Sequence, residues 1–208
     1  MESECTTFFV CTAAELRRGF PGWLPPLPKP VRRRMKMGNG KVLEIETQDP
    51  LWPADHVVPD PEYCSASGAE GYDDFLSARL RPFIRACPHW IARDLQDSEV
   101  NPLSAVLGVE APMKRVLFGP PASWGCVDQL PSESLSRLSG LDRQGLEDAA
   151  RRWAAVMSSP KNTQPLIMDV KMTDGWTVRE ARELLGPLAA LARRAKGEQK
   201  IYLLVDAA

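Results

Sequence analysis

Residues 6–11 read TTFFVC and residues 12–15 read TAAE. The β-branched and aromatic side chains of the first stretch favour a β-strand. The second stretch has the Ser/Thr-x-x-Glu spacing of a capping box, in which two unpaired amides at a helix start are satisfied reciprocally. We therefore expect a strand that leads directly into a short helix. This helix should end near Gly19, because Pro21 and the prolines that follow do not permit it to continue.

The other end of the chain carries a second strand signal. The apolar run at 200–205 predicts a final buried strand, and two amphipathic helices are expected before it. One spans 142–157, and the other follows a second capping box at Thr177–Glu180, with a kink or break expected at Gly186-Pro187. Strands at both ends with helices between them predict an α+β fold with a mixed sheet, as a single domain over 1–208.

A β-hairpin near 31–47 is the clearest local prediction. Two strand-like stretches, at 31–37 and 42–47, flank Gly38-Asn39-Gly40, whose residues tolerate the positive φ angles of a tight turn. Alternation places Arg32 and Arg34 on one face, within reach of two glutamates on the returning strand. The arginine run could bind phosphate or nucleic acid, but cross-strand neutralisation is the preferred interpretation.

The middle of the chain gives weaker patterns. Residues 73–80 and 88–95 are expected to form two short helices, and 114–118 a strand bounded by Gly119-Pro120-Pro121. A loop containing Trp124 and Cys126 is expected to follow. The prolines at 25–30 predict an extended strap over the core, while their PxxP spacing could instead be a ligand for an SH3-type domain.

Charge and composition exclude several classes of protein. The 26 basic and 27 acidic side chains give a formal charge of -1, so no general electrostatic attraction to nucleic acid is expected. Apolar runs are too short to span a membrane, and the N-terminus lacks the positive charge of a signal peptide. These features predict a cytoplasmic protein, and its five cysteines, which include no CxxC pair, are expected to be reduced thiols.

The near-zero charge conceals an acidic, proline-rich loop at 49–74. This segment holds seven acidic residues and no basic one: Asp49, Asp55, Asp60, Glu62, Glu70, Asp73 and Asp74. Long loops without secondary structure are uncommon inside compact domains and are often functional or disordered. Aromatic side chains amid negative charge suit a basic protein partner, so the expected contact residues are Trp52, Asp55, Asp60, Glu62, Tyr63 and Tyr72.

Motifs for cofactor or metal chemistry are weak. The glycines form neither GxxxxGK[ST] nor GxGxxG, so no phosphate-cradling nucleotide site of those kinds is expected, and no HExxH is present. Asp55, His56, Asp60 and Glu62, with Cys64 beyond them, could hold a divalent cation. Because prolines extend this stretch and no second half-site is identifiable, a solvated acidic loop is preferred, and no cofactor is expected.

Thiol chemistry gives the competing function. Cys126, expected on a glycine-flanked loop after a strand, could act as a nucleophile in a small hydrolase or transferase if His89 or His56 folded beside it. Since cysteine is among the most frequently buried residue types, a structural role is the simpler interpretation. Hydrogen-bond reach between Cys126 and one of these histidines would distinguish the two.

The second half of the chain also suggests a relationship. With ARRWA at 150–154, Trp176 before a helix and a closing strand, residues 130–208 resemble small bacterial proteins of unknown function, some of them encoded near toxins. The resemblance implies a fold more than an activity. Together with the acidic loop it favours a non-enzymatic protein-binding module, of the immunity or inhibitor type, that recognises a basic partner.

Overall fold

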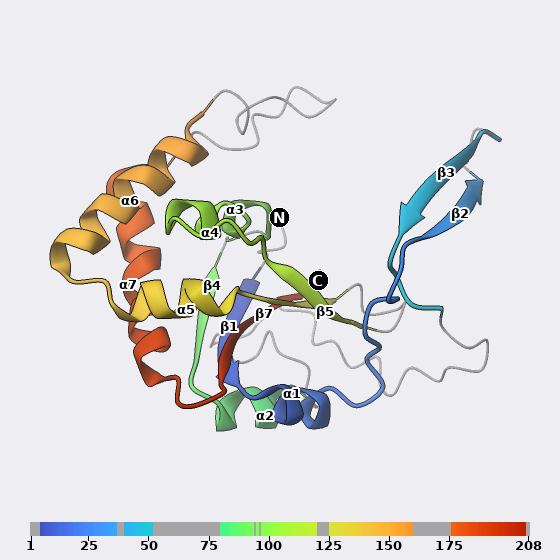
Figure 1. Ribbon diagram of the computed structural model, residues 1–208, viewed down its shortest axis with the longest axis horizontal. Helices are drawn as coiled ribbons and strands as arrows, with labels where there is room; N and C mark the ends of the chain where they lie inside the picture. The colour runs from blue at the N-terminus through green and yellow to red at the C-terminus, as the bar shows by residue number, and fades with distance from the viewer. Residues whose placement is uncertain are drawn as a thin grey trace, which may run out of the picture.

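The computed structural model describes residues 5–36, 40–51, 80–93, 95, 97–119, 125–159 and 176–206, and Figure 1 shows how its elements are arranged. Five strands form the main sheet in the order β4-β1-β7-β6-β5. They are β1 (Cys5–Cys11), β4 (His89–Arg93), β5 (Lys114–Phe118), β6 (Cys126–Gln129) and β7 (Lys200–Asp206). The α+β class is confirmed, and the first and last strands are neighbours in the sheet. All four ladders are antiparallel, whereas a mixed sheet was expected.

Helices cover the two faces of this sheet. One face packs against α5 (Ser132–Ser139), α6 (Arg143–Met157) and α7 (Val178–Arg194), with the short α3 (Asp97–Val100) and α4 (Leu103–Val106) beside them. The other face packs against α1 (Ala13–Gly19) and α2 (Leu80–Ala86). Alternate residues of each strand serve the two layers: Phe8 and Leu203 belong to the first cluster, and Phe9 and Tyr202 to the second.

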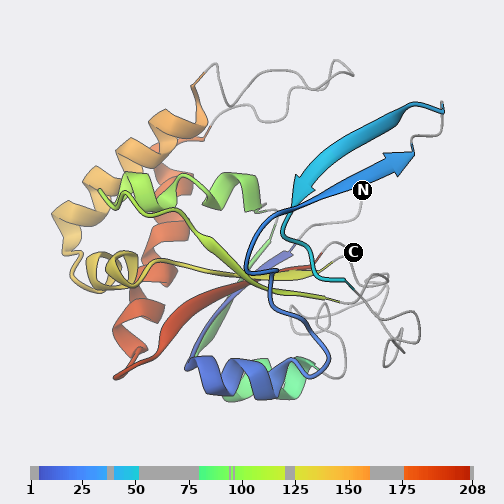
Figure 2. The same cartoon turned by 45° about the vertical axis from the view of Figure 1, so that its right-hand side comes forward.

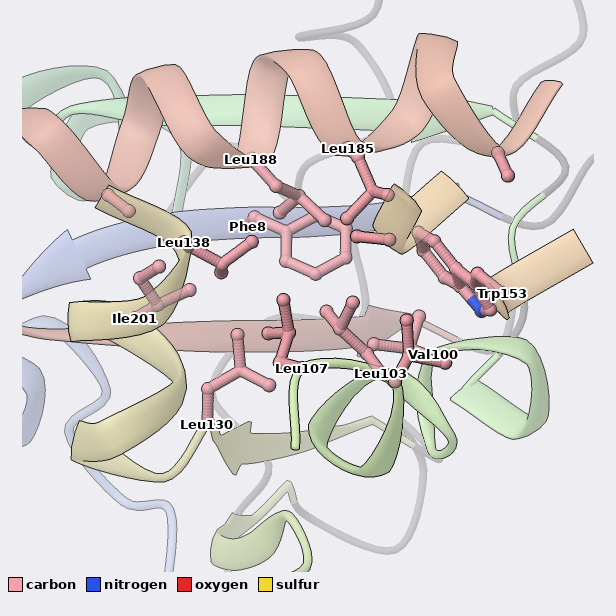
Figure 3. Close-up of a cluster of buried hydrophobic side chains, with 14 of the residues drawn as sticks. Phe8, Val100, Leu103, Leu107, Leu130, Leu138, Trp153, Leu185, Leu188 and Ile201 are labelled. Atoms are coloured by element: carbon pink, nitrogen blue, oxygen red, sulfur yellow. The ribbon is translucent and has the colours of Figure 1, made fainter. Parts of the chain in front are cut away.

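Trp153 of α6 lies at one end of the larger core. It is fully buried, and its indole nitrogen donates a hydrogen bond of 3.0 Å to the backbone oxygen of Glu99. Its ring lies 4.9 Å from that of Trp176, measured between centroids. Figure 3 shows Trp153 beside the apolar side chains that α4 and α7 contribute. The amphipathic helix expected at 142–157 is confirmed, with Ala150, Trp153 and Met157 on its buried face.

Both capping boxes form as expected. Thr12 and Glu15 exchange side-chain and backbone hydrogen bonds at the start of α1, and Thr177 and Glu180 do the same at α7. The break that was one expectation for α7 is wrong, because the helix continues through Gly186-Pro187 to Arg194, while the kink that was the other stays a prediction. The buried residues on either side of this dipeptide, Leu185 and Leu188, hold the helix against the sheet and offset the amide that Pro187 cannot donate.

Two strands were not predicted from the sequence. Residues 88–95 were expected to be helical, but His89–Arg93 forms β4, the edge strand that pairs with β1. Cys126 was expected on a loop, but it begins β6 and pairs with both β5 and β7. Of the helix expected at 73–80, only Leu80 is described, and it begins α2. Most of the acidic loop at 49–74, and the segment at 160–175, lie outside the described residues.

The expected hairpin forms a separate two-stranded sheet. Strand β2 (Val31–Lys36) pairs with β3 (Val42–Thr47), and neither strand joins the main sheet. Figures 1 and 2 show this ribbon projecting away from the helices and the main sheet. We refer to residues 31–36 and 40–51 as the arm. Gly40, two residues before β3, has φ of +79°, a conformation that favours glycine.

None of the helices in the described ranges is both long enough and apolar enough to cross a membrane.

Replacing Trp153 with alanine should lower the free energy of unfolding by about 3 to 5 kcal/mol, because it removes a buried large aromatic side chain and leaves a cavity. Thermal and denaturant unfolding would measure the loss. Arg151→Ala, on the exposed face of the same helix, is the control and should change stability by less than about 1 kcal/mol. A Trp153→Ala protein that melts with the parent would contradict the assigned packing.

The arm should show the fastest amide hydrogen exchange of any described strands. A two-stranded ribbon has only marginal stability by itself, so its amides should exchange through local opening rather than through global unfolding. Exchange followed by mass spectrometry should therefore show peptides from 31–36 and 42–47 labelled well before a peptide covering 201–204. Equal protection of the arm and β7 would show that the arm is fixed to the body of the protein.

Candidate functional site

The two faces of the arm differ in chemical character. Directly opposite residues in an antiparallel pair share a face, and the register sets Arg32 opposite Glu46 and Arg34 opposite Glu44. The Nε atom of Arg34 lies 2.9 Å from Oε1 of Glu44. The expected cross-strand neutralisation is confirmed at this pair. Because both side chains are exposed, the pair adds little to stability, but it neutralises part of this face.

The other face is more apolar and carries one anchoring arginine. Val31 lies opposite Thr47, and Arg33 lies opposite Ile45. The guanidinium Nη2 atom of Arg33 donates hydrogen bonds to the backbone oxygens of Asp49, at 2.5 Å, and Pro50, at 3.3 Å. Arg33 therefore holds the chain that leaves the arm against its base.

Exposed large hydrophobic side chains are concentrated on the arm. Val42, Leu43 and Leu51 are 59%, 46% and 72% exposed, and among the described residues they are the large hydrophobic side chains in this class. Single exposed hydrophobic residues are ordinary on protein surfaces. Their confinement to one projecting element is not ordinary and is typical of an interaction site.

A groove of about 970 Å³ lies beside the base of the arm. One wall is the proline-containing strap after α1, which the sequence predicts to be extended. The amide of Leu24 donates to the backbone oxygen of Phe118 at 3.1 Å, and the amide of Phe118 donates back at 2.8 Å. The amide of Leu27 donates to the backbone oxygen of Gln48 at 2.7 Å. The strap therefore connects the edge of the main sheet to the arm.

Apolar side chains and hydrogen-bond donors both line the groove. Trp23 and Leu27 come from the strap, Arg17 from α1, Lys114 from β5 and Tyr202 from the sheet floor. Within the described residues, Arg17 and Lys114 form no ion pair, although both are exposed. The neighbouring Arg115 binds the buried carboxylate of Asp128 through two hydrogen bonds, at 2.9 and 3.1 Å.

Tyr202 is the titratable phenol on the floor of the groove. Burial, together with the nearby Cys11, raises the pKa of Tyr202 to about 12. The phenol therefore stays protonated near neutral pH and acts as a hydrogen-bond donor rather than as a base. Among its described lining residues the groove has no carboxylate, imidazole or thiol.

The competing thiol site does not assemble around His89. Cys126 is buried in β6 and His89 lies in β4, with β7 and β1 between them. Three strand spacings separate the two strands by about 14 Å, which places Cys126 and His89 out of hydrogen-bond reach. Nδ1 of His89 instead lies 3.0 Å from the backbone oxygen of Cys87. His56, the other proposed partner of Cys126, lies outside the described residues.

The residues expected in the acidic contact surface also lie outside the described ranges. They are Trp52, Asp55, Asp60, Glu62, Tyr63 and Tyr72, and their role stays a prediction. The same holds for the set of possible metal ligands around His56. Elsewhere, within the described ranges, no three histidine, cysteine, aspartate or glutamate side chains gather as metal ligands do.

Sequence reasoning missed the groove. Arg17, Lys114 and Tyr202 come from three elements that are far apart in the chain, and only the sheet order and the path of the strap bring them together. The one sequence signal that bears on the groove was the run of prolines at 25–30, which predicts an extended strap but not the elements that face it.

Comparison of the chain with protein-family models, curated proteins and solved structures found no match. Any proposal about function therefore depends on the residues and their geometry.

Proposed function

We propose that this protein is a non-enzymatic protein-binding module and that the arm is its principal contact element. One observation carries the proposal: the exposed large hydrophobic side chains of the described residues all lie on the arm, with Val42 and Leu43 on the two faces of β3 and Leu51 at the base, and the β2–β3 ribbon belongs to no larger sheet. A partner that covers these side chains would remove their apolar surface from water and favour association.

The arm by itself is an unfavourable structure. A two-stranded ribbon buries little apolar surface, so the cost of ordering its backbone is poorly offset. The cross-strand pair of Arg34 and Glu44 is exposed and contributes little. A bound partner would supply the missing packing. The contact would resemble a standard protein interface, with an apolar centre and a charged rim.

Charge in the neighbouring sequence favours a basic partner. The acidic segment 49–74 begins directly after Gln48, at the base of the arm. Its carboxylates could attract basic side chains and speed the encounter. Arg17 and Lys114 beside the groove would repel a basic segment there, so the groove suits an apolar part of the same partner. An immunity or inhibitor role towards a basic protein fits this arrangement.

The variant Val42→Asp/Leu43→Asp should fold normally and lose its partner, because it places charge in the proposed apolar contact. Proteins retained by the immobilised wild type from a lysate of the source cells would be quantified by mass spectrometry and compared with those retained by the variant. Ala155→Asp/Ala190→Asp is the matched control, since both alanines are exposed on α6 and α7, away from the arm. It should retain the same proteins as the wild type.

Three results are informative here. The proposal is supported if a protein that the wild type and the control variant both capture is not captured by the arm variant. Equal capture by all three proteins contradicts it. If sedimentation instead shows a wild-type dimer that the arm variant dissociates, the arm binds a second copy of the chain, and the proposal of a different partner is wrong.

The acidic segment gives a second prediction. Reversing the charges of Asp55, Asp60 and Glu62 to lysine should slow association with the captured partner and weaken the dependence of its rate on salt, because charges at an interface rim act mainly on the encounter. Stopped-flow or surface-based kinetics at several salt concentrations would measure both effects. Glu110→Lys/Glu183→Lys/Glu198→Lys changes the net charge equally at exposed positions elsewhere. Identical kinetics for the two triple variants would contradict a role for the acidic segment.

A further inference from the structure

Two cysteines that are 76 positions apart in the sequence meet at one end of the sheet. Cys11 is the last residue of β1, and Cys87 lies between α2 and β4. The β1–β4 register pairs Phe9 with His89, and the amide of Val10 donates to the backbone oxygen of Pro88 at 2.9 Å. Continuing this register by two positions, through Val10 and Pro88, sets Cys11 directly opposite Cys87.

The position in the ladder suits a disulfide bond. Val10 and Pro88 form the hydrogen-bonded pair, although Pro88 has no amide to return the bond, so Cys11 and Cys87 occupy the next, non-hydrogen-bonded position. Opposite residues at such positions have Cα atoms about 4.5 Å apart. Disulfides form across Cα separations of roughly 4.4 to 6.8 Å. The two sulfurs can therefore be joined without a large backbone movement.

The two thiols interact but differ in chemical character. A hydrogen bond between them, in which Cys11 donates, raises the pKa of Cys11 and lowers that of Cys87. Burial further raises the pKa of Cys11, which is 1% exposed. Nearby Glu15 and the partial burial of Cys87 oppose the lowering at Cys87. Cys87 is the better nucleophile of the pair, and Cys11 is the protonated partner.

Only Cys87 is open to a reagent from solvent. It lines a pocket of about 460 Å³ together with Glu15 and Arg18 of α1 and Phe83 and Ala86 of α2. Cys11 lies behind it in the smaller core. The pocket thus gives a small molecule access to the sulfur of Cys87, while the sulfur of Cys11 is buried behind it.

We propose that Cys11 and Cys87 form a redox-active dithiol site that exchanges with low-molecular-weight disulfides. The Cys87 thiolate attacks one sulfur of the small disulfide, the S–S bond breaks, and one small thiolate leaves. Cys11 then loses its proton and attacks Sγ of Cys87, which releases the second small thiolate. The protein loses two hydrogens and gains one disulfide bond, and the small disulfide is reduced to two thiols.

Closing this bond would have a structural consequence. It would join the end of β1 to the connection between α2 and β4, and so fix α1 and α2 to the edge of the sheet. The site lies on the helical layer opposite α6 and α7, and it is separate from the arm.

The test is to incubate the purified protein with oxidised glutathione, block remaining thiols with an alkylating reagent, and map the peptides by mass spectrometry. The wild type and the control Cys126→Ser should both form a Cys11–Cys87 crosslink with the loss of two hydrogens. Cys11→Ser should stop with one glutathione on Cys87, and Cys87→Ser should leave Cys11 unmodified. A stable glutathione adduct on wild-type Cys87, or a crosslink that excludes this pair, would overturn the proposal.

Alkylation kinetics separate a redox site from two thiols that are merely close together. In the wild type, Cys87 should react faster than Cys126, and the midpoint of its pH–rate profile should rise in Cys11→Ala, because alanine has no donor to replace the hydrogen bond to the thiolate. Glu15 and Arg18 remain in that variant and serve as an internal control for the charges facing Cys87. An unchanged midpoint would overturn the assignment of Cys11 as the donor. If either Cys11 variant fails to fold, the crosslink in the wild type still decides the proposal.

Discussion

The pairing of β1 with β7 joins the beginning of the described chain to its end, and both hydrophobic layers depend on it. The ladder runs from Cys5 opposite Asp206 to Cys11 opposite Lys200. Because side chains alternate across a sheet, this one ladder supplies Phe8 and Leu203 to the larger core and Phe9 and Tyr202 to the smaller core. A shift by one residue would exchange the two sets and disrupt both layers at once. The remaining strands add to the two outer edges of this central pair.

Features with local signals were predicted well. The capping boxes at Thr12 and Thr177 depend on residues three positions apart, and the hairpin depends on a short turn between two alternating stretches. Strands β4 and β6 were missed because they are short and are stabilised by partners far away in the chain. The apolar residues of 88–95 fit the period of a helix about as well as that of a strand, and it is the pairing with β1 that makes this segment a strand.

The candidate sites depend still more on contacts between distant segments. No pattern within the sequence relates Arg17 to Lys114, or Cys11 to Cys87, because the sheet order and the strand register create both relationships. The spacing of the cysteines, which includes no CxxC pair, predicted reduced thiols and gave no sign that two of them meet where the β1–β4 register is continued beyond Phe9 and His89. Conversely, the acidic segment was identified from composition alone, and composition gives its charge without its geometry.

The body of the protein and the arm are thus stabilised by different interactions. The main sheet and its helices are stabilised by two buried layers, whereas the arm is joined to them through the strap and the hydrogen bond between Leu27 and Gln48. In this account the arm contributes to recognition and little to the stability of the body. Its exposed apolar side chains are unfavourable in water and contribute nothing to the packing of the two cores.

Excising the arm tests this division most directly. Residues 31–47 would be replaced by a short glycine-serine linker between Pro30 and Gln48. The two ends already lie close together, because the amide of Leu27 donates a hydrogen bond to the backbone oxygen of Gln48. The account predicts that the guanidinium unfolding midpoint stays close to that of the full chain and that unfolding remains a single cooperative transition. A large fall in the midpoint, or loss of cooperativity, would show that the arm is part of the folded core and would contradict its assignment as a contact element.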